Sequence, residues 1–286
     1  MHRFHLPPNE WQSSALALSG AEAHHAGHVL RLQPGDRAVV FDGRGREATT
    51  DITAVDSTTV HLRVLHEALT APLRCHIALA QAIPKGKNMD LIVQKAVEIG
   101  AAEIFPLLSA RTVVQLDPES AAQKQAKWQS VAIEAAKQCG QNWLPQVHEA
   151  RTPEEFFRDV DAGVAPAPPI LSVAPTNPQR GGAAERHPER PTRAPRHFDL
   201  QLVGSLQPGA RHLKEILSDY EDEQEQEESR RPRRVLMAIG PEGDFTPAEI
   251  SLARSHGCVP LTLGPVILRV ETAAIYCLSI LSYELL

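Results

Sequence analysis

Residues 235–249 read VLMAIGPEGDFTPAE, and this stretch sets the architecture that we expect for the chain. Its first five residues are apolar, which predicts a short buried strand. Thr246 then begins a predicted helix, because a threonine cap is followed by proline at the first helical position and by glutamate at the third. Between them, Gly240 and Gly243 lie in a turn. The stretch therefore predicts a strand, a glycine-bearing turn and a helix in direct succession.

The same alternation of strands and helices continues on both sides of this stretch. Apolar runs of strand length alternate with helical patterns from about residue 74 to the end of the chain. The expected strands span 75–83, 103–108, 199–204, 235–239 and 259–263, and the expected helices span 89–99, 120–139, 211–217 and 271–285, with two more opening at Thr152 and Thr246. This order predicts an α/β fold with a parallel sheet and helices on both faces.

The N-terminal quarter of the chain has a different pattern. Short apolar runs and stretches rich in β-branched residues are separated by turn signals, and they fall on Val29–Leu32, Ala38–Phe41, 49–55 and 59–65. Short strands with frequent turns are typical of a small β-barrel. Pro72 marks a plausible boundary, so we expect two domains, at 1–72 and 73–286.

Two segments interrupt the second domain. Half of the positions in residues 162–197 are Ala, Pro or Gly, a composition that does not build a packed core. Residues 219–232 are rich in acidic side chains and end in a cluster of arginines. We expect flexible insertions at about 162–197 and 219–232.

The net charge of −6 does not exclude a nucleic acid as partner, because the acidity is local. Eight acidic residues and no Lys or Arg fall between Glu215 and Glu228. The rest of the chain is slightly basic, so the pooled charge neither favours nor excludes RNA as a partner.

The sequence shows no pattern of secretion, of a membrane protein or of a metal site. The four cysteines are widely spaced without a CxxC pair, and the N-terminus lacks an apolar signal segment. The apolar tail at 273–286 is shorter than the roughly 20 residues of a membrane span. His24, His25 and His28 have helical spacing but no acidic or cysteine partner at ligand spacing. We expect a cytoplasmic protein with reduced thiols, no metal and no membrane partner.

Two glycine-bearing turns are the candidate ligand site. The first, Gly240 to Phe245, follows the strand at 235–239, and the second, Gly264-Pro265, follows the strand at 259–263. Ligands of open α/β sheets bind at the carboxyl ends of strands, and glycine lets backbone groups approach a ligand closely. Neither turn has the sequence of a phosphate-binding loop. The turns suit a nucleoside held by backbone groups and apolar walls; two ordinary strand-to-helix turns explain the pattern equally well.

Several segments together resemble a known family. AIGPEGDFTPAEI (238–250) and LGPVILRVETAA (263–274) strongly resemble the two signature segments of the 16S rRNA (uracil-N3) methyltransferases, which belong to the trefoil-knotted SPOUT class. Similar matches cover nearly the whole chain outside the two insertions, at KGKNMD (85–90), QKAVEIG (94–100), RTVV (111–114), EAAKQCG (134–140), HAGHVLRLQPGD (25–36) and FDG (41–43). These motifs are specific in combination and weak one at a time.

The resemblance implies a fold, a cofactor and partners. It implies an N-terminal PUA-like barrel, a knotted α/β domain, a homodimer, and methylation of N3 of a uridine in the decoding region of 16S rRNA or of the small ribosomal subunit. The cofactor would be S-adenosylmethionine. Carried over to this chain, its contacts fall on Gly240, Pro241, Glu242, Gly243, Leu263, Gly264, Ile267, Leu268, Thr272 and Ala273.

The chain departs from the family pattern at four positions. Asp244 stands where the family usually has glycine, Val266 and Gln141 where it has arginine, and Val270 where it has threonine. Asp tolerates a left-handed backbone better than most residues. The loss of two arginines bears more on the contacts with RNA than on the cofactor site.

The implied reaction needs a base and a cation beside the uracil. N3 must lose its proton before it attacks the methyl carbon, and it lies on the Watson–Crick edge, so the target base must be unpaired or splayed out. Arg269 is the first candidate to stabilise the uracil anion, and Glu271 or Glu242 could act as base or hold Arg269. A phosphate contact or an ion pair at an interface explains Arg269 equally well. A favourable interaction of an acidic residue with the helix N-terminus explains Glu271 equally well.

RNA would be held by cations around the barrel and the cleft. The candidates for phosphate contacts are Arg3, Arg31, Lys85, Lys87, Lys95 and Arg111. Two other functions stay open at this point: another SPOUT methyltransferase that modifies a tRNA base or a ribose 2′-hydroxyl, and a non-catalytic RNA-binding assembly factor.

Overall fold

The N-terminal residues form a mixed five-stranded sheet. The structure is a computed structural model, and it describes residues 1–12, 15–114, 116–161, 198–223 and 231–286. The strands pair in the order β1-β3-β4-β5-β2, with β1 parallel to β3 and the other pairs antiparallel. Their bounds are β1 His2–His5, β2 Ala17–Ser19, β3 Arg37–Phe41, β4 Arg46–Val55 and β5 Thr59–Leu69.

A helical segment covers this sheet where the sequence pattern suggested strand. The apolar run Val29–Leu32 is not a strand: α1 (Gly20–His24) continues into a π-helical turn, η1 (His25–Val29). Ala23 and Ala26 point into the core of the unit, which is why the helix packs there. This segment contains small alanines and a histidine-rich face, so it shows neither a clear helical period nor a clear strand period. The sequence pattern alone therefore does not distinguish a helix from a strand.

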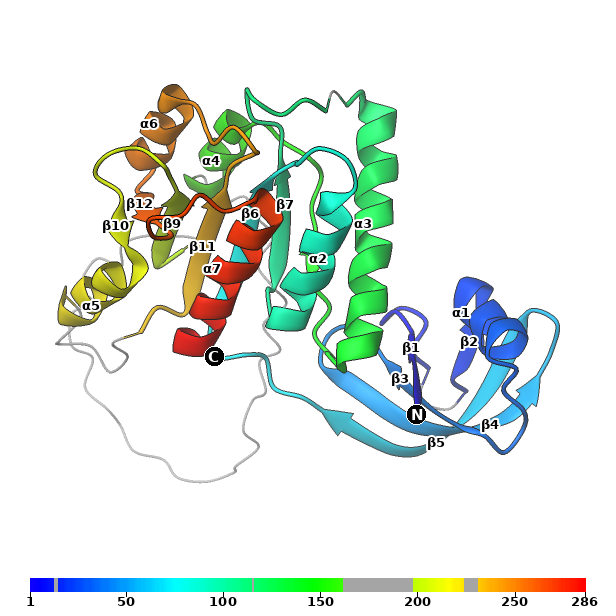
Figure 1. The fold of residues 1–286 in the computed structure, drawn as a ribbon. Helices are drawn as coiled ribbons and strands as arrows, with labels where there is room; N and C mark the ends of the chain where they lie inside the picture. The colour runs from blue at the N-terminus through cyan, green and yellow to red at the C-terminus, as the bar shows by residue number, and fades with distance from the viewer. Residues whose placement is uncertain (13–14, 115, 162–197, 224–230) are drawn as a thin grey trace, which may run out of the picture.

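The second sheet is parallel throughout, which confirms the predicted α/β class. Its strands pair in the order β10-β12-β9-β11-β6-β7-β8 (Figure 1). Their bounds are β6 His76–Ala82, β7 Glu103–Leu107, β8 Gln146–Val147, β9 Leu200–Gly204, β10 Arg211–His212, β11 Arg234–Ile239 and β12 Val259–Thr262.

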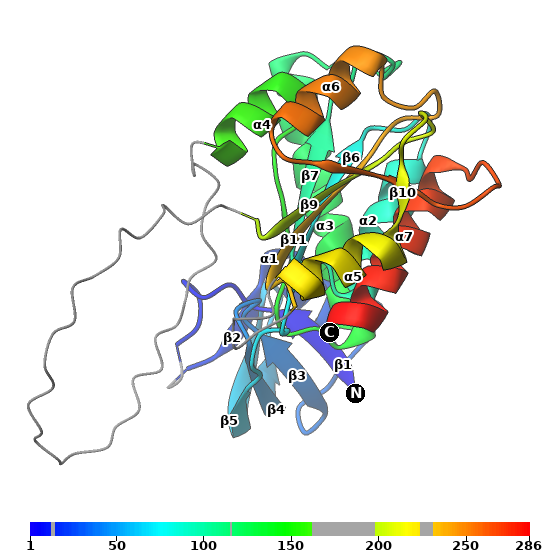
Figure 2. The ribbon, with the colours of Figure 1, turned by 90° about the vertical axis from the view of Figure 1, so that its left-hand side faces the viewer.

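Helices cover both faces of this sheet, as predicted (Figure 2). On β6, Ile77 and Leu79 face one side and Ala78 and Ala80 the other, as the period of two of a strand requires. One side carries α2 (Asn88–Ile99), α3 (Pro118–Cys139), α5 (Leu213–Glu223) and α7 (Val270–Leu285), and the other carries α4 (Pro153–Asp161) and α6 (Pro247–Ser255). None of the helices in the described ranges combines the length and hydropathy that a bilayer-spanning helix needs.

The two predicted insertions fall mostly outside the described residues, which leave out 162–197 and 224–230. Residues 219–223, expected in the acidic insertion, instead continue helix α5. Leu213 and Ile216 bury the inner face of α5 against the sheet, and the acidic side chains lie on its outer face. The predicted boundary near Pro72 falls between β5 and β6, and the division into two domains stays a prediction.

A buried cation joins the N-terminal sheet to the parallel-sheet unit. The Lys137 ammonium of α3 is nearly buried, donates to both Glu22 oxygens at 3.2 Å and to Glu134 at 2.8 Å, and lies 5.8 Å from the Phe4 ring centroid. Arg3 adds a second link, with bonds to Glu47 and to Asn142 beyond the end of α3. These contacts place the N-terminal sheet beyond the amino ends of the parallel strands (Figures 1 and 2).

Candidate ligand pocket

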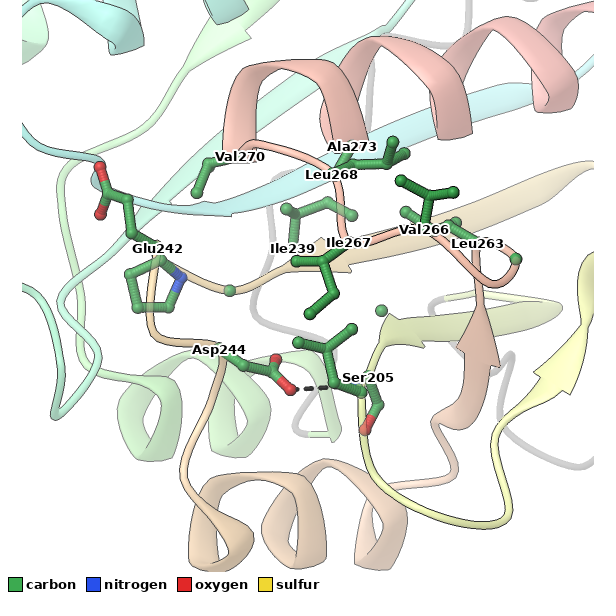
Figure 3. Close-up of a pocket in the computed structure, with 15 residues that line it drawn as sticks. Ser205, Ile239, Glu242, Asp244, Leu263, Val266, Ile267, Leu268, Val270 and Ala273 are labelled. Carbon is green, nitrogen blue, oxygen red and sulfur yellow. Dashed lines mark hydrogen bonds between the residues drawn. The ribbon is translucent and has the colours of Figure 1, made fainter.

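The pocket lies where three strands of the parallel sheet reach their carboxyl ends (Figure 3). The loops that follow β9, β11 and β12 meet there, and the first turn of α7 closes the remaining side. The lining residues are Gly204, Ser205, Leu206, Ile239, Gly240, Pro241, Glu242, Asp244, Leu263, Gly264, Val266, Ile267, Leu268, Val270 and Ala273. This is the crevice in which open α/β sheets bind ligands.

The turn after β11 requires a glycine at its first position. A Cβ on Gly240 would lie 2.9 Å from the Phe245 nitrogen and 3.1 Å from the carbonyl carbon of Asp244. Both are backbone atoms, so nothing can move aside without opening the turn. At Gly243, by contrast, a Cβ would meet only the flexible side chain of Arg111, at 3.2 Å.

The predicted helix start fixes the far end of this turn. Thr246 accepts a hydrogen bond from the Glu249 amide at 3.2 Å, and Glu249 accepts one from the Thr246 amide at 2.8 Å, which completes a capping box. The other Glu249 oxygen accepts from the Ala110 amide at 2.8 Å, and Arg111 donates to the carbonyl of Gly243. The loop after β7 therefore holds the turn from outside.

Carboxylates are the only charged side chains that line the pocket among the described residues. They belong to Glu242 and Asp244, while Ile239, Leu263 and Leu268 are apolar. A phosphate or another anion would be repelled here, since no cation compensates the two acids. The pocket suits a ligand with an apolar, flat part and a positive charge.

The loop from β6 to α2 forms one side of the rim of the pocket, and this loop and the first residue of α2 contact the two candidate bases. The Lys85 amide donates to Glu242 at 2.8 Å, and the Asn88 side chain donates to Glu271 at 3.3 Å. Arg269 is exposed at the cap of α7, just beyond the lining residues. This loop exposes Lys85 and Lys87, so cations lie on one side of an acidic pocket.

The structure brings most of the predicted cofactor contacts together. All of them line the pocket except Gly243 and Thr272, which lie beside it. The sequence reasoning missed the third loop, at Gly204, Ser205 and Leu206. Its signal is present in the sequence, because residues 199–204 are predicted as a strand and the rule that points to carboxyl ends applies equally there.

The predicted RNA contacts divide into two groups. Arg31, Lys85 and Lys87 are exposed. Arg3, Lys95 and Arg111 instead bond within the chain, respectively with Glu47 and Asn142, with Glu98, and with the carbonyl of Gly243. The guanidinium of Arg3 is mostly buried and bonds to Asn142 across the contact between the two units, and its role as an RNA contact stays a prediction.

Cysteine and metal chemistry have no support in the described part of the chain. All four cysteines lie in it, and none forms a disulfide. Burial raises the pKa of the Cys75 and Cys277 thiols to about 12, so neither supplies a thiolate at neutral pH. Among the described residues, no group of three or more His, Cys, Asp or Glu side chains could hold a metal ion.

Comparisons with known proteins agree with this architecture. Residues 71–167 and 201–282 match a model of an RNA methyltransferase domain, and residues 18–65 match one of an RNA methyltransferase PUA domain. The chain is 28% identical to the Bacillus subtilis ribosomal RNA small subunit methyltransferase E over 96% of its own length and 91% of that protein.

Two solved structures share the fold over nearly the whole chain. One is a Legionella pneumophila protein described as a methyltransferase in complex with SAM, with a TM-score of 0.76, 30% identity and coverage of 99% of this chain and 97% of that one. The other is the Neisseria gonorrhoeae ribosomal RNA small subunit methyltransferase E bound to S-adenosyl methionine, with a TM-score of 0.73, 26% identity and coverage of 99% and 98%.

The two glycines of the first turn give a matched pair of variants. We expect Gly240→Ala to lower the free energy of unfolding by about 1–3 kcal/mol, because overpacking against backbone forces a shift. Gly243→Ala should cost less than about 1 kcal/mol, since only the Arg111 side chain must move. Urea unfolding measures both, and equal losses would contradict the close approach at Gly240.

Proposed function

Since the chain belongs to the RNA methyltransferase family, whose PUA and methyltransferase domains it matches in that order, we propose that it methylates RNA of the small ribosomal subunit with S-adenosylmethionine as methyl donor. The observation that carries the proposal is the pocket: an apolar, acidic crevice at strand ends, bounded by exposed cations. The N-terminal unit, 1–72, would bind RNA, and 73–286 would carry the reaction.

The pocket fits this donor in shape and charge. Adenosine is flat and largely apolar, and Ile239, Leu263 and Leu268 offer walls for it. The donor carries a net positive charge at neutral pH, which Glu242 and Asp244 complement. When bound, it supplies a methyl group on a sulfonium, already activated for transfer. The protein's own task is then to place the acceptor and to manage its proton.

The acceptor that we propose is N3 of a uridine in the decoding region of 16S rRNA. This finer assignment rests on the family resemblance of the segments at 238–250 and 263–274. N3 is protonated at neutral pH and hidden in a base pair, so the reaction needs an unpaired base and a proton acceptor. With an rRNA acceptor, we propose the cytoplasm as the site of the reaction.

Of the two candidate bases, Glu271 suits the proton transfer better. Glu242 accepts a hydrogen bond from the Lys85 amide. This bond occupies one carboxylate oxygen and holds the rim loop. Glu271 lies in the first turn of α7, two residues after exposed Arg269, and is oriented by Asn88. A carboxylate and a guanidinium at one helix start can remove the proton and stabilise the resulting anion.

A second copy of the chain would complete the RNA-binding surface. The N-terminal sheet lies at the opposite end of the parallel strands from the pocket of the same chain (Figure 1). Apolar side chains are exposed along α7 and the loop before it: Tyr276, Tyr283, Val266 and Ile267. A two-fold axis perpendicular to α7 would bury this stripe and turn the partner's N-terminal sheet toward this pocket. We therefore propose a homodimer, and the knot implied by the family resemblance as its C-terminal core.

Sedimentation equilibrium tests the dimer. We expect a mass of twice the 31.3 kDa chain, and a monomer when Tyr283, 86% exposed, is replaced in Tyr283→Glu. Leu69→Glu, at an exposed position on the N-terminal sheet, serves as control and should leave the mass unchanged. A monomeric unaltered chain would refute the proposed assembly.

Methyl transfer to small-subunit RNA or to assembled particles tests the proposed reaction. We expect 3-methyluridine in nucleoside mass spectrometry, and a yield that falls steeply with salt, because phosphate contacts release counterions. A different methylated base or a 2′-O-methyl product would identify another RNA methyltransferase. Absence of S-adenosylmethionine binding at millimolar concentration in calorimetry would favour a non-catalytic RNA-binding factor.

Paired carboxamide variants separate the two acids. Glu271→Gln should lower the rate of methyl transfer by about 100-fold and remove its dependence on a basic group, with little change in donor affinity. Glu242→Gln should keep most of the rate, since an amide oxygen still accepts the Lys85 N–H. A pH–rate profile under single-turnover conditions measures both. The reverse ranking would assign the base to Glu242.

A further inference from the structure

Asp244 stands out in the pocket because of its backbone conformation. Its φ is 61°, and among the described residues only Arg31 shares a positive φ without being glycine. A left-handed backbone is strained for a residue with a Cβ, and less so for Asp than for most residues. Glycine would be free of strain at this position. We therefore infer that contacts of the Asp244 carboxylate offset the strain of its backbone.

The carboxylate of Asp244 joins two of the three pocket loops. One oxygen accepts the Leu206 amide at 3.0 Å, across the crevice in the loop after β9, and the other accepts the Phe245 amide at 2.8 Å (Figure 3). Both donors are neutral backbone groups, so the negative charge is retained. Each oxygen also keeps acceptor capacity that these single bonds do not use.

Of the two lining acids, Asp244 is the one that faces the interior of the pocket. Glu242 is exposed and turned toward the rim, where it accepts the Lys85 amide. Asp244 is half-buried on the side of the pocket opposite Val270 and Ala273, and its carboxylate points toward the loop after β9 (Figure 3). No cationic side chain of the described residues lines the pocket, and its apolar walls weaken screening by water.

We propose that Asp244 is a specificity-determining residue, whose charge favours the positively charged sulfonium donor over its neutral demethylated product. The inference rests on the proposed function. In the transfer, the acceptor nitrogen forms a bond to the methyl carbon and loses its proton to the base. The carbon–sulfur bond breaks and its electron pair stays on sulfur, which becomes a neutral thioether. The attraction of Asp244 for the ligand therefore falls when the reaction is complete, which speeds product release.

The affinity ratio of the two ligands tests the assignment without any catalytic readout. Calorimetry measures S-adenosylmethionine and S-adenosylhomocysteine on the unaltered chain, on Asp244→Asn and on Asp244→Gly. Asn tolerates the left-handed backbone and retains one acceptor, whereas Gly removes the side chain and the strain. We expect both variants to lower the preference for the sulfonium ligand about five- to tenfold. The ratio cancels any loss of pocket geometry, since that affects both ligands alike.

Two control variants separate the effect of the Asp244 charge from the effect of a left-handed backbone and from the effect of the rim acid Glu242. Arg31→Gly relieves the other left-handed residue, far from the pocket, and should leave the ratio unchanged. Glu242→Gln removes the rim acid, which also faces the donor's charge, and should lower the ratio less than Asp244→Asn does, because Glu242 is exposed to water. In the unaltered chain the preference should weaken with added salt, and in Asp244→Asn it should not.

The outcomes distinguish this inference from the proposed function. An unchanged ratio in both Asp244 variants, with the unaltered chain binding both ligands, overturns the role of Asp244 and leaves the methyltransferase proposal intact. If the unaltered chain binds neither ligand, both proposals fall together.

Discussion

The pocket depends on one steric constraint, the close approach of the chain to itself at Gly240. Any side chain there would meet the backbone of the same turn at 2.9 Å. The turn is tight because the capping box of α6 begins immediately after it, and Phe245 is already buried in the core between the sheet and α6. Further restraints act on the turn from outside, among them Ala110 on Glu249, Arg111 on Gly243, and Leu206 on Asp244. A glycine with no room for a Cβ thus lets three loops meet at one point.

Local patterns are enough to predict the elements that are long or carry caps. The helices at Asn88–Ile99 and Pro118–Cys139 end at Gly100 and Gly140, both left-handed, as a glycine cap predicts. At 235–249 the apolar run predicts the strand, the two glycines predict the turn, and the capping box predicts the start of the helix. These signals are local, since each depends on a few consecutive residues, and they also locate most of the pocket.

Features decided by long-range contacts escape such patterns. β1 is four residues long and is held by parallel pairing with β3, about 35 positions away, which no local period encodes. Arg3 carries the positive charge that an RNA contact needs, and only its hydrogen bonds to Glu47 and Asn142 show its structural role. The helical turn at 20–29 lacks a clear period, and its burial is set by the sheet beneath it. Asp244 is visible in the sequence as a departure from the family pattern, but its bond to Leu206 joins residues 38 positions apart.

The distribution of charge links these contacts to the proposed reaction. The acidic residues of α5 lie on its outer surface, where Asp219 pairs with Arg211, while the exposed Lys85 and Lys87 border the pocket. Under the proposed function, an RNA strand would be attracted to the rim and repelled by the acidic interior, which would be left to a cationic donor. Lys137 holds the N-terminal sheet at the opposite end of the strands, at a fixed distance from this rim. The two surfaces proposed to bind RNA lie at opposite ends of one chain, so a single structured RNA site can engage both only by spanning the molecule or by using a second copy.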